Sequence, residues 1–191
     1  MNLSLLRNAR PSPGVARRHS LLHPECPIEQ TLRGNDSETQ GQLMREPWSH
    51  KIRPDGTLFV ADHSGLRLLA RSERSLEAAV EPLKRRFGTR LTVNAPGVRY
   101  AFGVPTLEPY MMVLINGPAR HLSVIRDDFL RRRGRIKRLD ERGPFILEGE
   151  APLAALLGYR QWLRDLIQDD AYVSLRLSRY LPIDDDGPRA A

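Results

Sequence analysis

Residues 110–117 read YMMVLING, and this stretch decides the fold class. From Tyr110 to Ile115 the run is apolar and uncharged, which is typical of a strand at the centre of a sheet. Pro118 follows, where proline favours the first turn of a helix. The next apolar residues repeat at the spacing of one helical face: Leu122, Ile125 and Phe129. A buried strand that leads into an amphipathic helix predicts a layered α+β domain.

The same alternation continues towards the C-terminus. Strands are expected over residues 135–139, 145–150 and 173–178. A second helix is expected over residues 152–167, and its apolar face consists of Tyr159, Trp162, Leu163, Leu166 and Ile167. We expect Gly134 to end the first helix and Gly158 to allow a close packing contact in the second. With right-handed crossovers, this order predicts a ferredoxin-like βαββαβ sandwich over residues 105–183, with two helices covering one face of an antiparallel sheet.

Residues 54–104 predict a smaller unit of the same kind. Strands over 57–61 and 66–70 form a hairpin, and a helix over 76–87 and a strand over 90–93 follow. Pro82 lies inside the helical pattern and costs about 3 kcal/mol in a helix interior, so we expect a kink or a late start. The resulting ββαβ unit is a partial ferredoxin-like plan that lacks the opening strand and helix.

Residues 1–53 and 184–191 have the composition of unstructured tails. The first 24 residues contain no Asp or Glu, and prolines interrupt every helical or strand pattern before residue 54. Such a segment cannot bury enough apolar surface to offset its ordering entropy. An organellar presequence is the alternative, because the start is acid-free and contains Arg and Ser. Pro11 and Pro13, however, break the amphipathic helix that a presequence needs.

The basic charge of the chain comes almost entirely from arginine. The 191 residues include 30 Lys and Arg against 23 Asp and Glu, a net charge of +7, and Lys51, Lys84 and Lys137 are the only lysines. The guanidinium group suits bidentate phosphate contacts, so a nucleic-acid partner is expected, with an arginine-biased proteome as the plain alternative. No apolar run approaches the roughly 20 residues of a membrane helix. We therefore expect a cytoplasmic protein that does not enter membranes.

Catalytic and metal sites find little support in the sequence. Cys26 is the single cysteine, which excludes a disulfide framework and a cysteine-rich zinc site. The five histidines lack metal-ligand spacing, and no Gly-x-x-x-x-Gly-Lys-Ser/Thr loop is present to cradle phosphates. No set of residues assembles a nucleophile, a base and an orienting group. We expect a protein that is not an enzyme and that uses no cofactor, metal or GTP.

Two regions of the sequence resemble a family of translation factors. The stretches Leu107–Tyr110, Phe129–Gly134, Asp140–Gly143, Pro152–Leu153, Leu157–Tyr159 and Leu163–Arg164, with Gln168 and Tyr180, closely resemble domain V of bacterial elongation factor G. The stretches Leu76–Glu77, Leu83–Gly88, Val93 and Val98–Tyr100 are similar to the end of domain III of those factors. The resemblance implies a ferredoxin-like fold, and a surface that docks at the ribosome's GTPase-associated region, touching large-subunit RNA and protein.

The chain departs from this family in three ways. Nothing in it corresponds to the GTPase domain or to domain II. Residues 101–106 stand where elongation factor G carries its whole domain IV, so the resemblance does not imply translocation. Asp169 and Asp170 follow Gln168 at a loop that is basic in the family, which puts the family's RNA contact at this loop in doubt.

A dense basic run is the candidate binding site. It consists of Arg131, Arg132, Arg133, Arg135, Lys137 and Arg138, and Arg160 and Arg164 on the second helix extend it. Contact with RNA, contact with a protein surface and a merely solvated face are the three interpretations, and cations also complement the dipole at a helix C-terminus. Because side chains alternate along a strand, we expect that not all of the run can share one side.

These observations favour a non-enzymatic, translation-associated protein that binds the ribosome or its large-subunit RNA at the factor-binding region without GTP hydrolysis. One alternative is a protein-interaction module that reuses the ferredoxin-like fold and binds a partner or itself through a sheet edge. The other is a degenerate paralogue of the translation factor.

Overall fold

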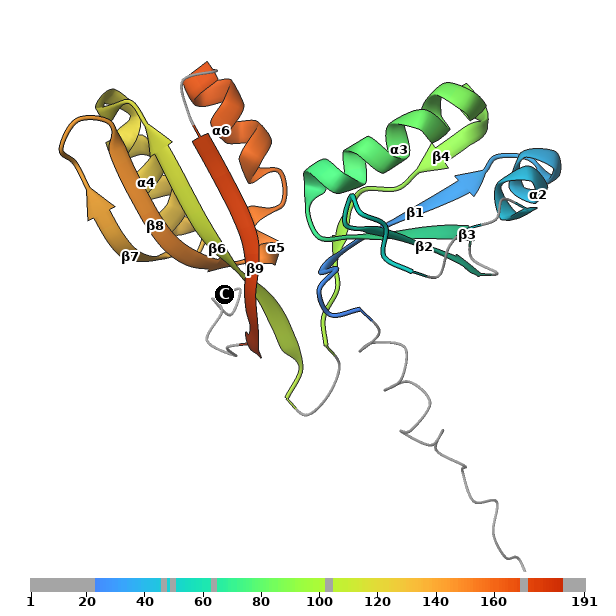
Figure 1. Cartoon of the computed structure of the whole chain (residues 1–191), viewed down its shortest axis with the longest axis horizontal. Coiled ribbons are helices and arrows are strands. Elements are labelled where there is room, and N and C mark those ends of the chain that lie inside the picture. The colour runs from blue at the N-terminus through green and yellow to red at the C-terminus, as the bar shows by residue number, and fades with distance from the viewer. Residues whose placement is uncertain are drawn as a thin grey trace, which may run out of the picture.

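Two α+β units, each built on an antiparallel sheet, follow one another along the chain (Figure 1). The computed structural model describes residues 23–45, 48, 51–62, 65–101, 105–168 and 172–183. Residues 1–22 of the tail expected over 1–53, the tail expected over 184–191, and the loop with Asp169 and Asp170 lie outside the described residues. The mixed α+β class expected from the sequence is confirmed.

The first unit contains a strand and a helix that the sequence analysis missed. Its elements are β1 (Ile28–Gly34), α2 (Ser37–Arg45), β2 (Thr57–Asp62), β3 (Gly65–Ala70), α3 (Glu73–Phe87), the 3-10 turn η1 (Gly88–Arg90), β4 (Leu91–Val93) and β5 (Gly97–Val98). The sheet order is β2-β3-β1-β4, and β5 also pairs with β1. The prediction of an unstructured tail is therefore wrong for residues 28–45. The unit has the complete βαββαβ order rather than a partial ββαβ order.

The sequence analysis missed β1 and α2 because contacts with distant parts of the chain stabilise them. β1 buries Ile28 and Leu32, but its other side chains are polar or partly exposed. Backbone pairing with β3 on one side and β4 on the other holds the strand in the middle of the sheet. The N-terminus of α2 has a cap, because Asp36 Oδ1 accepts the Thr39 N–H at 2.7 Å. That hydrogen bond also lowers the pKa of Asp36.

α3 accommodates a proline without the late start that the sequence suggested. The helix runs from Glu73 to Phe87, and Ser72 caps it by accepting the Ser75 N–H at 3.1 Å. Pro82 and Ala78 are both exposed. The Ala78 carbonyl, which has no N–H donor at residue 82, can therefore be hydrated, and this lowers the cost of the proline.

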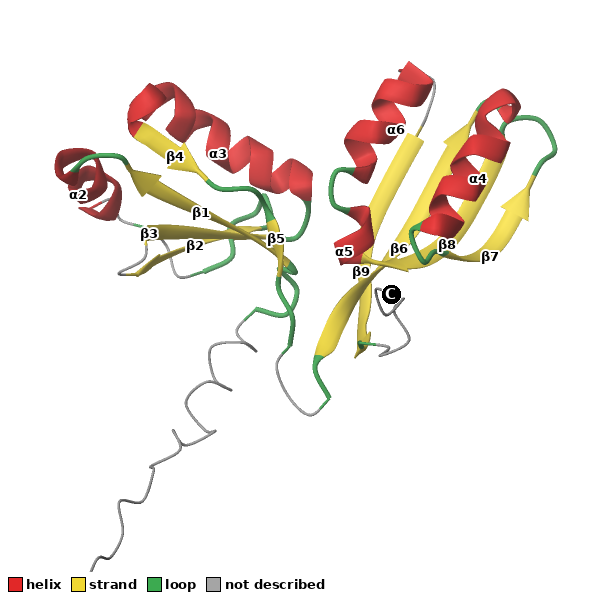
Figure 2. Cartoon of the chain, turned by 180° about the vertical axis from the view of Figure 1, so that it is seen from behind, coloured by secondary structure: helices red, strands yellow, loops and turns green. Residues whose placement is uncertain are grey.

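The second unit has the predicted ferredoxin-like topology. Its elements are β6 (Leu107–Gly117), the 3-10 turn η2 (Ala119–His121), α4 (Leu122–Arg131), β7 (Arg135–Asp140), β8 (Phe145–Pro152), α5 (Leu153–Leu156), α6 (Tyr159–Ile167) and β9 (Tyr172–Pro182). The strand order is β7-β8-β6-β9, and each neighbouring pair is antiparallel. The helices lie on one face of this sheet (Figure 2).

The second helix of this unit is broken where one continuous helix was predicted. α5 ends at Leu156 and α6 begins at Tyr159, because Gly158 adopts a left-handed backbone with φ of 75°. Apart from its two chain neighbours, no described residue has an atom within 4 Å of the position that a Cβ at Gly158 would take. Glycine is therefore required here by the backbone angle and not by the close packing that the sequence suggested.

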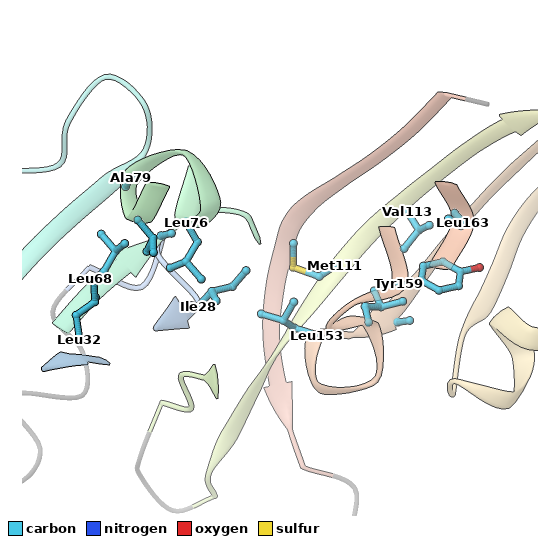
Figure 3. Packing of buried hydrophobic residues seen from close by; sticks show 14 of the residues in the cluster. Ile28, Leu32, Leu68, Leu76, Ala79, Met111, Val113, Leu153, Tyr159 and Leu163 are labelled. Carbon is cyan, nitrogen blue, oxygen red and sulfur yellow. The ribbon is translucent and has the colours of Figure 1, made fainter. Parts of the chain in front are cut away.

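The core of the second unit lies between the sheet and its helices. Met111, Val113 and Ile115 of β6 are buried, together with Phe129 of α4 and Leu163 of α6. Leu163 is 0% exposed, which confirms the predicted helix phase. Hydrophobic contacts continue into the first unit, where Ile28 and Leu76 approach Leu153 (Figure 3).

A charged side chain also joins the two units. Glu73, in the first turn of α3, accepts the Gly158 N–H at 2.8 Å, just before α6. Burial raises the pKa of Glu73, while the Gly158 hydrogen bond and the nearby Arg160 oppose that rise. In a second polar contact, the Tyr180 hydroxyl of β9 donates to the Pro24 carbonyl at 2.8 Å. Polar contacts therefore join the two units in addition to the apolar packing.

We expect Leu163→Ala to lower the free energy of unfolding by about 2–5 kcal/mol, because it leaves a cavity under α6. Leu130→Ala is the matched control, since Leu130 is a leucine of α4 that is 50% exposed. Urea unfolding followed by circular dichroism would measure both. Equal midpoints for the two variants would contradict the packing described here.

We expect Glu73→Ala to speed hydrogen exchange at the Gly158 amide several-fold, because the carboxylate that accepts this N–H is lost. Glu77→Ala, one helical turn further along α3, should leave that amide unchanged. Exchange measured by NMR on the full chain provides the test. Unchanged protection of Gly158 in Glu73→Ala would show that the two units do not meet through this contact.

Candidate nucleic-acid interface

The partly buried Arg132 makes most of its contacts within the domain. Its Nε lies 2.6 Å from Asp128 Oδ2, and its Nη1 donates to the Ala155 carbonyl at 2.9 Å. The guanidinium carbon also lies 4.9 Å from the centre of the Tyr159 ring and 5.7 Å from that of Trp162. These contacts tie the end of α4 to α5 and α6, so Arg132 is a structural residue.

Arg133 is paired within the unit although its side chain is 45% exposed, and it occupies the backbone position expected for Gly134. After α4 the Arg133 N–H bonds to the Leu130 carbonyl, and the Gly134 N–H bonds to that of Phe129. This is a Schellman motif, and its left-handed residue is Arg133, with φ of 60°. The guanidinium pairs with both carboxyl oxygens of Glu108 at 3.3 Å, and Glu108 is only 2% exposed.

Gly134 is needed for a different reason. A Cβ at this position would lie 2.5 Å from the Phe129 carbonyl oxygen. A left-handed conformation costs a non-glycine residue about 1–2 kcal/mol. Arg133, next to Gly134, adopts the left-handed conformation, and its ion pair with the buried Glu108 offsets this cost in free energy.

The remaining cations of β7 lie on the face of the sheet that the helices leave uncovered. We call this the open face. It is defined by three rows of residues that the strand register places side by side: Arg135, Glu150, Met112 and Arg176; then Arg138, Glu148, Leu114 and Ser174; then Asp140, Ile146, Asn116 and Tyr172. The residues between them on β6 and β8 are buried under the helices, which confirms the direction of this face.

A β-bulge brings a third cation of β7 towards the same face. The pairing of β7 with β8 shifts between Ile136 and Arg138, so Lys137 is an extra residue. Its Nζ reaches Glu150 Oε1 at 2.9 Å. Strict alternation would have turned Lys137 or Arg138 away. The bulge instead lets Arg135, Lys137 and Arg138 share one side.

Two further cations on the opposite edge were missed by the sequence analysis. Arg176 of β9 is exposed, and Arg179 is 55% exposed and bonds to Glu150 Oε2 at 2.8 Å. They lie far from the basic run in sequence, and only the sheet brings them to its surface. The signal was present in the alternation of Val173, Leu175 and Leu177, which turns Arg176 to the opposite face.

The cations of the open face form two rims. With strands about 4.8 Å apart, β7 and β9 are separated by roughly 14 Å across the sheet. Arg135, Lys137 and Arg138 form one rim, and Arg176 and Arg179 form the other. Between them lie Met112, Leu114 and the carboxylates of Glu148 and Glu150. The open face is therefore basic at both edges and mixed at its centre.

The other predicted site residues lie elsewhere. Arg131 is 74% exposed at the end of α4, 3.7 Å from Asp128. Arg164 of α6 donates to Gln161 Oε1 at 2.7 Å. Arg160 lines, with Glu73, a cavity of about 30 Å³ between the two units. The predicted site residues are thus split between two surfaces, the helix side of the sheet and the open face.

Neither metal-binding nor membrane-spanning features occur in the part of the chain that the structure describes. No group of three His, Cys, Asp or Glu residues there could hold a metal ion. Among the same residues, no helix is long and apolar enough to cross a membrane.

Comparison with known proteins agrees with this architecture. Residues 105–190 match the family described as elongation factor G C-terminus. The chain contains an elongation factor G C-terminal domain. A solved structure from Thermus thermophilus superimposes with a TM-score of 0.55 at 14% identity, covering 83% of this chain and 41% of that one. At this identity the likeness concerns the fold.

Curated relatives match over this C-terminal domain. Elongation factor G 2 of Anaeromyxobacter dehalogenans is 40% identical over 78 residues, which are 40% of this chain and 11% of the relative. The mitochondrial ribosome-releasing factor 2 of Danio rerio is 38% identical over 82 residues, which are 42% of this chain and 11% of the relative. The match thus spans about a ninth of the length of these relatives.

We expect Arg133→Ala to destabilise the C-terminal domain by up to about 3–5 kcal/mol, because Glu108 would stay buried without its partner. Arg131→Ala, two residues away and mostly exposed, should change stability by less than about 0.5 kcal/mol. Thermal unfolding of both variants would measure the difference. An unchanged melting temperature for Arg133→Ala would mean that the Glu108 pair contributes little.

Proposed function

We propose that this protein is a translation-associated factor that binds large-subunit RNA and protein at the ribosome's factor-binding region through the open face. Its C-terminal domain matches the family described as elongation factor G C-terminus, and curated relatives carry the names of translation and ribosome-releasing factors. The protein acts in the cytoplasm and without GTP hydrolysis. The 191 residues contain no phosphate-cradling Gly-x-x-x-x-Gly-Lys-Ser/Thr loop, which supports the proposal that the protein does not hydrolyse GTP.

The observation that carries the proposal is the pair of basic rims on the open face. Guanidinium and ammonium groups at two edges suit phosphates of a folded RNA backbone. The central strands present Met112, Leu114 and Ile146, and Tyr110 of β6 is 5% exposed. A platform for stacking single-stranded bases needs exposed rings. The exposed ring of this face is Tyr172, at its β9 edge. Backbone contacts are therefore favoured over base stacking.

A charge reversal on both rims tests the proposal. The triple variant Arg135→Glu, Arg138→Glu, Arg176→Glu should strongly weaken ribosome co-sedimentation and lower the salt slope of the remaining binding by about 2–3, at roughly 0.7–0.9 for each phosphate contact. The matched control, Lys84→Glu, Arg85→Glu, Arg90→Glu, makes the same charge change on the first unit. Equal loss in both variants would indicate non-specific attraction, and binding that survives the triple variant would overturn the proposal. A flat calorimetric titration with GTP is expected for the wild type.

A second candidate function is binding of a protein strand at a sheet edge. β9 is an 11-residue strand at the end of the sheet order, so its outer edge is a possible pairing surface. β7, at the other end, carries a bulge and several charges, which disfavour pairing. Co-sedimentation that persists at high salt would favour this function, because an apolar or backbone-paired interface is less sensitive to ions.

A further inference from the structure

Glu150 has the opposite charge to the groups around it. It lies on β8 in the middle of the open face, between Arg135 of β7 and Met112 of β6. The residue is only 5% exposed. A buried carboxylate on a basic surface needs partners for its oxygens, and those partners show what it does.

Both rims of the open face supply the partners. Lys137 Nζ lies 2.9 Å from Glu150 Oε1, and the Ser178 hydroxyl donates to the same oxygen at 2.7 Å. Arg179 Nη2 reaches Oε2 at 2.8 Å. Lys137 comes from one edge strand and Arg179 from the other. The carboxylate thus binds a cation from each rim and a hydroxyl from β9.

The same three side chains, Lys137, Ser178 and Arg179, could equally well donate hydrogen bonds to a phosphate group. Lysine, arginine and serine all donate to anionic oxygens at such distances. The Lys137 and Arg179 side chains are 47% and 55% exposed, so an incoming anion can reach both. Glu150 cannot leave, since its backbone is fixed in β8.

We propose that Glu150 is a built-in counter-ion that competes with RNA phosphates for Lys137 and Arg179 and so limits how strongly the open face binds polyanions. The inference rests on the proposed function, in which the open face holds phosphates. The Ser178 hydrogen bond, with help from Lys137 and Arg179, lowers the pKa of Glu150 despite its burial. The carboxylate therefore competes throughout the neutral pH range.

Glu148 provides a matched control on the same strand and face. It lies two residues from Glu150, is 40% exposed, and approaches Arg138 at 3.7 Å. Neutralising either residue changes the net charge by the same amount. Loss of Glu150, however, should release two closely held cations, whereas loss of Glu148 releases one loosely held cation at most.

The test compares Glu150→Gln with Glu148→Gln in the full chain. Binding to a fluorescently labelled, synthetic A-form RNA duplex is followed by anisotropy across a salt series. For Glu150→Gln we expect tighter binding and a salt slope steeper by about 1.4–1.8, from two released cations, against no more than about 0.9 for Glu148→Gln. Equal slopes in the two variants, or no duplex binding by any of the proteins, would overturn the inference.

A second variant covers the case in which Glu150→Gln fails to fold, which circular dichroism would detect. If Glu150 already neutralises Lys137, then Lys137→Gln should leave the salt slope within about 0.3 of the wild type, well short of the 0.7–0.9 expected for a phosphate contact. A salt slope lower by about 0.7–0.9, the full value of one phosphate contact, would show that Lys137 was available to RNA, and this would overturn the inference.

The two proposals can fail separately. If the wild type does not bind ribosomes but Glu150→Gln gains duplex affinity beyond Glu148→Gln, the counter-ion role stands and the ribosome proposal fails. If the wild type binds ribosomes through the rims but the two glutamine variants behave alike, the ribosome proposal stands and the counter-ion role fails.

Discussion

The double pairing of β6 is the constraint on which both faces of the C-terminal domain depend. This strand pairs with β8 along one edge and with β9 along the other. Because successive side chains point to opposite faces, the pairing sends Met111, Val113 and Ile115 under the helices and Met112 and Leu114 to the open face. A slip of one residue would exchange the two sets, so burial of the core also fixes the rows of the open face.

The approach of α4 to this sheet sets the conformation of the following turn. A Cβ at Gly149 of β8 would lie 2.7 Å from both the Arg135 carbonyl oxygen and Phe129 Cε1. Gly134 is as tightly packed against Phe129, so neither residue can carry a side chain without displacement. The left-handed residue of this turn is Arg133, and Glu108 pairs with its guanidinium. The contacts of Arg132 with Asp128 and of Arg133 with Glu108 thus use part of the basic run within the domain.

The density of charge along the sequence differs from its density in space. Arg132 and Arg133 are adjacent to Arg135 in the chain, yet they face the helices and the buried Glu108. Arg176 and Arg179 are distant in the chain, yet they share a face with Arg135 through the register of the sheet. The candidate interface is therefore a product of strand order, and its central carboxylates moderate the charge that the composition implies.

Local patterns in the sequence determined most of the C-terminal domain. The run from Tyr110 to Ile115 and the periodic face around Leu163 specify their elements because each buries enough apolar surface by itself. The same reasoning missed β1 and α2, and it misassigned the roles of Gly134 and Gly158. β1 buries Ile28 and Leu32 and is held by hydrogen bonds to β3 and β4, whose residues are remote in the chain. Tertiary structure alone decided that strand, the bulge at Lys137 and the meeting of Arg179 with Glu150, because each depends on backbone pairing between distant segments.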